Sequence, residues 1–102
     1  SISQFELHLR ALLNPPTPEL KTTAPSVMVN LIGIEHNNEW LNLPFSQLHW
    51  YGKEVRVGRK VGHINLTHPD KAELTKLLEQ LRPALTEDFN SGLDWVIEKL
   101  RV

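Results

Sequence analysis

Hydrophobic and polar positions recur at helical spacing in the last third of the chain and predict two amphipathic helices there. The first follows the capping pattern Thr67-His68-Pro69-Asp70, and the second has Ser91 and Asp94 at the same capping spacing. Pro83 ends or kinks the first helix, because proline has no N–H to donate. The apolar positions are Leu74, Leu77, Leu78, Leu81 and Leu85 in the first helix, and Leu93, Val96, Ile97 and Leu100 in the second.

Short apolar runs with β-branched and aromatic residues predict strands ahead of these helices. Residues 26–33 form such a run ending in glycine, and residues 47–52 alternate and carry aromatic side chains. Residues 53–57 and 59–66 predict two further strands, joined in a hairpin near Gly58. The predicted fold is therefore α+β: a small antiparallel β-sheet or partial barrel, with an N-terminal helix and two C-terminal covering helices.

The start of the chain is predicted to be a separate helix over residues 1–13. Ser3 and Glu6 have capping-box spacing, and Ile2, Phe5, Leu9, Leu12 and Leu13 share one helical face. Residues 14–25 hold four prolines and are predicted to be an extended linker. Residues 26–102 then form the β-rich module. A helix that begins at once, after a serine rather than a methionine, favours a piece cut from a larger enzyme.

Composition narrows the possible chemistry. The chain has 102 residues, a net charge of −1 with histidines neutral, and no cysteine, which excludes disulfides, thiolate nucleophiles and cysteine-ligated metals. No apolar run is long enough to predict a membrane span, and no signal peptide is visible, so a cytoplasmic protein is expected. The near-zero charge means that any affinity for anions must come from a local cluster.

One such cluster lies in residues 53–63, with the sequence KEVRVGRKVGH. Four cations fall within eight residues, against the single carboxylate of Glu54, and glycines interrupt them. Strand alternation would place Lys53, Val55 and Val57 on one face. Arginine and lysine between glycines suit a phosphorylated small molecule or a carboxylate, since glycine lets a ligand approach the backbone. A solvated hairpin whose charges only protect a sheet edge would show the same pattern.

Other chemistries have weaker support. The five histidines show neither i, i+4 spacing on a predicted helix nor an H-x-H on a strand, so no metal site is predicted. No catalytic residue is assigned, because no serine lies beside a plausible base and no G-x-x-x-x-G-K-[ST] loop is present. The aromatic cluster at residues 49–51 could stack a base, but it is interpreted as core. The candidate substrate-binding residues are Lys53, Arg59, Lys60 and His63.

Three ordered blocks resemble the C-terminal region of the 5-(carboxyamino)imidazole ribonucleotide synthase family, the ATP-grasp ligases of bacterial purine biosynthesis. They are SQFELHLRA (3–11), APSVMVNLIG (24–33) and LHWYGKEVRVGRKVGHINL (48–66). The resemblance implies a ligase that converts aminoimidazole ribonucleotide, bicarbonate and ATP to the carbamate, ADP and phosphate. It further implies that residues 1–13 are the last helix of the ATP-grasp domain. ATP and magnesium would bind upstream of Ser1 and not to this segment, which alone would be inactive.

The resemblance also implies roles for residues and partners. Lys53 and Arg59 would face the phosphate end of the ribonucleotide, with weaker support for Lys60 and His63. The missing ATP-grasp lobes of the same chain would be a partner, and the full-length enzyme a homodimer. The family usually has proline where this chain has Val57. Proline would fix φ at this position, whereas valine leaves the backbone of the following turn less restricted.

Two alternatives use the same residues differently. A nucleic-acid-binding module would grip phosphates with the basic hairpin 53–63, although a single compact cluster in a chain of charge −1 argues against it. An interaction domain would instead expose the first helix to a partner lobe.

Overall fold

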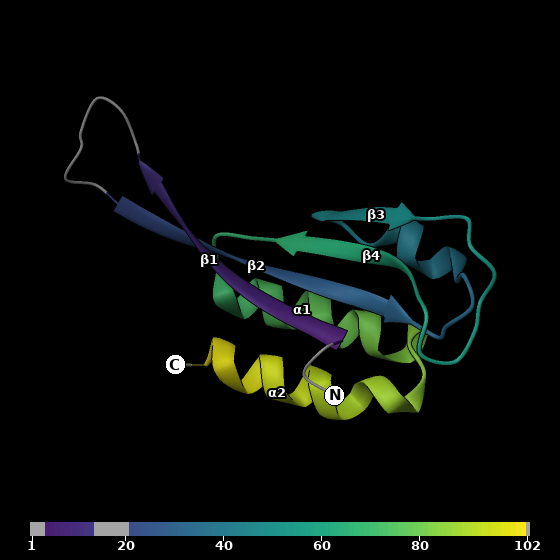
Figure 1. The fold of residues 1–102 in the computed structure, drawn as a ribbon. Coiled ribbons are helices and arrows are strands. Elements are labelled where there is room, and N and C mark those ends of the chain that lie inside the picture. Colours follow the sequence, from purple (N-terminus) through teal and green to yellow (C-terminus); the bar gives the residue numbers. More distant parts are fainter. Residues whose placement is uncertain (1–3, 14–20, 102) are drawn as a thin grey trace.

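The fold is a four-stranded antiparallel sheet with two helices packed on one of its faces (Figure 1). The computed structural model describes residues 4–13 and 21–101, and side chains for 4–8 and 24–101. The strands have the spatial order β1-β2-β4-β3 and are β1 (Phe5–Leu13), β2 (Lys21–Ile32), β3 (Ser46–Trp50) and β4 (Lys60–Thr67). The helices are α1 (Lys71–Leu81) and α2 (Asn90–Leu100), with 3-10 turns η2 (Asn38–Asn42), η3 (Arg82–Ala84) and η4 (Glu87–Phe89). The predicted α+β class, antiparallel sheet and covering helices are confirmed.

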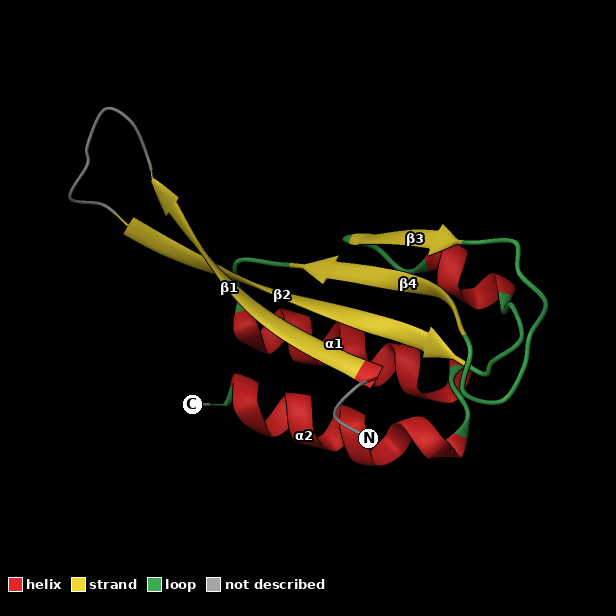
Figure 2. Ribbon diagram, viewed as in Figure 1, coloured by secondary structure: helices red, strands yellow, loops and turns green. Residues whose placement is uncertain are grey.

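The pleat of the sheet divides its side chains between a core face and an open face. Phe5, Val29 and Ile64 are paired across three strands and are all buried against the helices. The neighbouring register row holds Glu6, Met28, Asn65 and Gln47, which lie on the other face. Figure 2 shows the layering, with both α-helices on one side of the sheet. We call the side away from α1 and α2 the open face.

The leucine periodicity of α1 is confirmed for Leu74, Leu77, Leu78 and Leu81, which are buried. It is wrong for Leu85, because α1 ends at Leu81 and Leu85 follows the 3-10 turn η3. The capping residue is Asp70, whose carboxylate accepts a hydrogen bond from the Ala72 N–H at 2.8 Å. Thr67, the first residue of the predicted pattern, is instead the last residue of β4. Pro83 lies in η3, directly after the end of α1.

The second predicted helix is also present, but its start differs from the prediction. The 3-10 turn η4 runs directly into α2, which has no side-chain cap. Asp94 does not cap the helix, and accepts a hydrogen bond from Arg82 Nη2 at 2.6 Å. Arg82 also donates to Glu79 at 2.8 Å, and the two carboxylates together raise the pKa of the guanidinium. This arrangement ties the end of α1 to α2.

The predicted N-terminal helix over residues 1–13 is wrong, because residues 5–13 form strand β1. The sequence Phe-Glu-Leu-His from residue 5 alternates apolar and polar side chains, so it also has the period of a strand. Pairing with β2 satisfies the backbone of β1 and buries Phe5 beside Val29. The predicted linker is wrong over residues 21–25, which lie in β2. Residues 1–3 and 14–20 lie outside the described part of the chain.

The predicted strand over residues 53–57 and its hairpin are also wrong. Residues 51–59 form a loop between β3 and β4, with a turn in which the Arg59 N–H donates to the Arg56 carbonyl at 3.0 Å. Both edges of β4 are already occupied, by β2 and β3, so residues 53–57 have no free partner there. The predicted strands at 26–33, 47–52 and 59–66 correspond to β2, β3 and β4.

Candidate functional site

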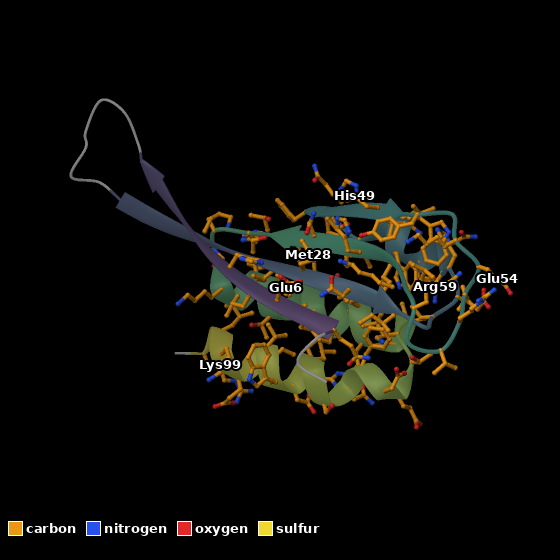
Figure 3. The ribbon with its side chains drawn as sticks, viewed as in Figure 1. Glu6, Met28, His49, Glu54, Arg59 and Lys99 are labelled. Carbon is orange, nitrogen blue, oxygen red and sulfur yellow. The ribbon has the colours of Figure 1, made fainter. Side chains whose placement is uncertain are left out.

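The predicted site residues gather where the 51–59 loop meets the open face, at the end of β2. We call residues 51–59 the basic loop. Figure 3 shows Arg59 and Glu54 at this end of the molecule, beyond the labelled Glu6 and Met28 of the sheet. Lys53 and Arg59 lie in the basic loop, whereas Lys60 and His63 lie on β4, next to it. The predicted alternation of Lys53, Val55 and Val57 on a strand face does not apply, because this segment is not a strand.

The basic loop is held to the end of β2 by Gly33. The Gly33 N–H donates to the Arg59 carbonyl at 2.8 Å. Gly33 has a φ of 62°, and a Cβ at this position would lie 3.4 Å from both the Arg56 carbonyl oxygen and the Gly58 nitrogen. Glycine meets both demands, since it accepts positive φ and leaves room for the loop backbone. The glycine that ends the predicted strand 26–33 therefore positions the cations.

The four cations of the cluster differ in how far they are neutralised. Arg56 forms an ion pair with Glu54 at 3.2 Å, with both side chains exposed. Arg59 donates through Nη1 to the backbone carbonyl of Glu54 at 3.2 Å, which leaves its charge without a carboxylate. Among the described side chains, those of residues 4–8 and 24–101, neither Lys53, Arg59 nor Lys60 forms an ion pair. Three positive charges thus remain available to an anion at this end of the sheet.

A β-bulge brings Lys60 and His63 to the same face. Gly62 pairs with Leu31, but Lys60 pairs with Ile32, so Val61 is an extra residue in β4. Residues three apart in a regular strand face opposite sides, and the extra residue cancels that inversion. The charge of Lys60 acts on both His63 and Glu6, which agrees with a position on the open face.

His63 is the most constrained of the four predicted residues. Its Nδ1 lies 2.7 Å from the Tyr51 hydroxyl, and its ring stacks on His49 with 4.5 Å between centroids. Partial burial, followed by the repulsion of His49 and Lys60, lowers the pKa of His63. We therefore treat His63 as neutral near pH 7, so that one ring nitrogen accepts and the other donates.

Tyr51 is the functional candidate that the sequence interpretation missed. Residues 49–51 were predicted to be core aromatics, and Trp50 does pack against the core, 6.1 Å from buried Trp40. His49 and Tyr51 are exposed, with Tyr51 at 41%. Alternation along β3 is the signal that separates them, because residues next to an inward Trp50 point outward.

A hollow on the open face lies away from the basic loop. It has a volume of about 690 Å³ and is lined by His8, Met28, Phe45 and Asn65, among others. None of the four predicted residues lines it. Among the described side chains, no group of three His, Cys, Asp or Glu residues could hold a metal ion. No helix in the described ranges is long and apolar enough to cross a membrane.

Comparison with known proteins places this arrangement in a family. Residues 26–77 match the phosphoribosylaminoimidazole carboxylase C-terminal domain. The chain belongs to this family of C-terminal domains, which confirms the resemblance seen in the three sequence blocks.

The named relatives agree with one another. The chain is 72% identical over 101 residues to the N5-carboxyaminoimidazole ribonucleotide synthase of Haemophilus influenzae. The aligned region covers 99% of this chain and 28% of that protein. It is 56% identical over 99 residues to the enzyme of the same name from Escherichia coli, covering 97% of this chain and again 28% of the relative. The chain thus spans only 28% of the length of either of these relatives.

Solved structures support the fold assignment. The N5-carboxyaminoimidazole ribonucleotide synthetase of Thermus thermophilus superposes with a TM-score of 0.58 at 45% identity, over 62% of this chain and 18% of that one. The phosphoribosylaminoimidazole carboxylase ATPase subunit of Aquifex aeolicus gives a TM-score of 0.53 at 36% identity, over 61% of this chain and 20% of the subunit.

Proposed function

We propose that this chain is the C-terminal domain of a ligase that converts aminoimidazole ribonucleotide, bicarbonate and ATP to N5-carboxyaminoimidazole ribonucleotide, ADP and phosphate. Within that enzyme, the basic loop and the adjoining end of β4 bind the phosphate group of the ribonucleotide. The observation that carries this proposal is the set of three cations, Lys53, Arg59 and Lys60, that have no ion pair within the described residues. A phosphate monoester is the dianion that such a set would neutralise.

Each residue has a distinct part in the proposed contact. Arg59 presents a planar fork whose backbone is fixed by Gly33, and Lys53 and Lys60 supply point charges. Neutral His63 adds a ring N–H rather than a charge. The short loop and open sheet face leave this end accessible to a ligand that is held elsewhere by its aminoimidazole ring.

The rest of the reaction is assigned to the part of the relatives that this chain does not match. There, bicarbonate would take the γ-phosphoryl group of ATP to give carboxyphosphate and ADP. The ribonucleotide amine would then attack the carboxyl carbon and release phosphate. ATP, magnesium, the ATP-grasp lobes as partner, the homodimer and the cytoplasmic location all remain parts of this proposal, as does inactivity of the chain alone.

The domain division is retained as a proposal in modified form. The family match begins at residue 26, where the β-rich module was predicted to begin. Residues 5–13 pair with β2 in the same sheet. We therefore assign them to the β-rich module rather than to the ATP-grasp domain.

The alternative, a nucleic-acid-binding module, uses the same cations. The neutralised Arg56 and the compact cluster offer no stripe of charge that would follow a backbone. A gel shift with generic oligonucleotides at low salt tests it, and salt-sensitive binding would favour this alternative.

The proposed function is tested by replacing the matched segment of the Haemophilus influenzae enzyme with residues 1–102 of this chain. We expect the chimera to form ADP in a reaction that requires both bicarbonate and aminoimidazole ribonucleotide. The parent enzyme is the positive control, and the same enzyme without the segment is the negative control. A folded chimera with no ribonucleotide-dependent ADP formation would contradict the proposal.

A further inference from the structure

Tyr51 connects two of the proposed phosphate-binding residues. Its hydroxyl lies 2.7 Å from Nδ1 of His63, and the Lys53 ammonium lies 5.7 Å from the centroid of its ring. The Tyr51 N–H donates to the Val61 carbonyl at 3.0 Å, which fixes the backbone just beyond the end of β3. A single side chain therefore contacts one cation of the basic loop and the histidine of β4.

The contact with His63 can form in either neutral tautomer, because the Tyr51 hydroxyl can donate to Nδ1 or accept from it. With the hydroxyl as donor, which is the direction used here, a neutral imidazole carries its proton on Nε2. The ring is held on its other side by stacking on His49 of β3, at 4.5 Å and 22°. The other charged neighbours are Lys60 of β4 and Glu6 of β1, which act on its pKa in opposite directions. Nε2 is then the N–H that a ligand on the open face would meet.

The contact with Lys53 restricts a flexible side chain. An ammonium over a tyrosine ring is attracted by the negative face of the ring. Lysine otherwise loses considerable rotamer freedom when it binds an anion, so an ammonium already held over a ring binds with a smaller entropic cost. The ring leaves the charge of Lys53 intact, whereas a carboxylate partner would neutralise it.

We propose that Tyr51 is a positioning residue for a phosphate monoester: its ring holds Lys53, and its hydroxyl holds His63 with Nε2–H directed to the same anion. The inference rests on the proposed function. It goes beyond it by naming a residue that acts through two others and need not touch the ligand itself.

The test uses two substitutions that separate the two contacts. Tyr51→Phe keeps the ring under Lys53 and removes the hydroxyl, and Tyr51→Leu removes both. In the chimera, we expect Tyr51→Phe to raise the KM for the ribonucleotide roughly 2- to 13-fold, the loss of one ordinary hydrogen bond. Tyr51→Leu should raise it further, and in both variants KM should rise more than kcat falls.

Two readouts separate positioning from a merely structural role. The imidazole ¹⁵N shifts of His63 in the 102-residue chain should show protonated Nε2 in the parent and a mixture of tautomers in Tyr51→Phe. In a His63→Ala background, Tyr51→Phe should have no further effect on KM. An unchanged tautomer in Tyr51→Phe, or full additivity of the two substitutions, overturns the inference.

The outcome is distinguishable from failure of the proposed function. If Arg59→Ala raises KM while Tyr51→Phe leaves both KM and the His63 tautomer unchanged, the phosphate site stands and the role of Tyr51 falls. If the chimera is inactive, inorganic phosphate is titrated into the 102-residue chain and its Tyr51→Phe variant. Equal phosphate affinity, or no binding to either, then also overturns the inference.

Discussion

The two faces of the sheet differ in what their side chains contribute. On the core face, α1 and α2 bury leucines such as Leu74, Leu78 and Leu93 completely. On the open face and in the basic loop, polar and charged residues remain accessible, and His49 projects away from the helices (Figure 3). Stability is thus concentrated on one side, and the proposed chemistry lies at one end of the other. Substitutions on either side should therefore have separable effects.

The largest expected effect is on stability, from Leu78→Ala in α1. Leu78 is 0% exposed, and removing a buried leucine side chain should reduce the free energy of unfolding by about 2–5 kcal/mol. Urea unfolding of the 102-residue chain measures this. Leu41→Ala is the control, because Leu41 is 63% exposed and its loss should change stability by less than about 0.5 kcal/mol. Equal effects at the two positions would contradict the assignment of Leu78 to the core.

A smaller stability effect is expected from Val57→Pro in the basic loop. Val57 is fully exposed and occupies the second position of the turn that Arg56 and Arg59 close, before Gly58 with a φ of 78°. That position of a type II turn favours proline, which should raise the free energy of unfolding by about 0.4–1 kcal/mol. Val57→Ala is the control for loss of the valine side chain. A destabilised Val57→Pro variant would show that the turn has another geometry.

The smallest effect concerns pH and comes from His63. Its pKa in the folded chain lies below the ordinary value of 6.5, because of burial first and then of His49 and Lys60. The unfolded chain therefore binds more protons below about pH 6.5, and stability should fall as the pH drops through this value. Above about pH 6.5, His63 is neutral in both the folded and the unfolded chain, and the stability that depends on it is fully present. Unfolding measured at pH 7.5 and pH 5.5 should show this loss, and His63→Gln should reduce it. A parent chain that gains stability on acidification would contradict the assignment.

The same comparison shows what the sequence could predict. Helix periodicity located α1 and α2, because burial on one side leaves leucines at a fixed spacing. The residue types of the site were predictable from their density of charge. The conformation of residues 53–57 was not predictable, because a strand, a hairpin and a loop all accommodate alternating lysine, valine and arginine. A strand or hairpin there is excluded only by the pairing of β4 with both β2 and β3.

The N-terminal error has a related cause. Residues 5–13 satisfy both a helical and a strand pattern, and the partner strand that decides between them lies beyond residue 20. The role of Tyr51 was hidden for another reason. It depends on the contact with His63, twelve residues away, which no local pattern records.

The central claim, that the charges left unpaired in the basic loop bind the ribonucleotide phosphate, is tested most directly by a matched pair of arginine substitutions in the chimera. Arg59 has no carboxylate partner in the described structure, whereas Arg56 is paired with Glu54. We predict that Arg59→Ala raises the KM for aminoimidazole ribonucleotide by about 10- to 150-fold, the loss of one charge-assisted contact of roughly 1.5–3 kcal/mol, and that Arg56→Ala changes it far less. Unchanged kinetics in Arg59→Ala, or equal losses in the two variants, would contradict the account.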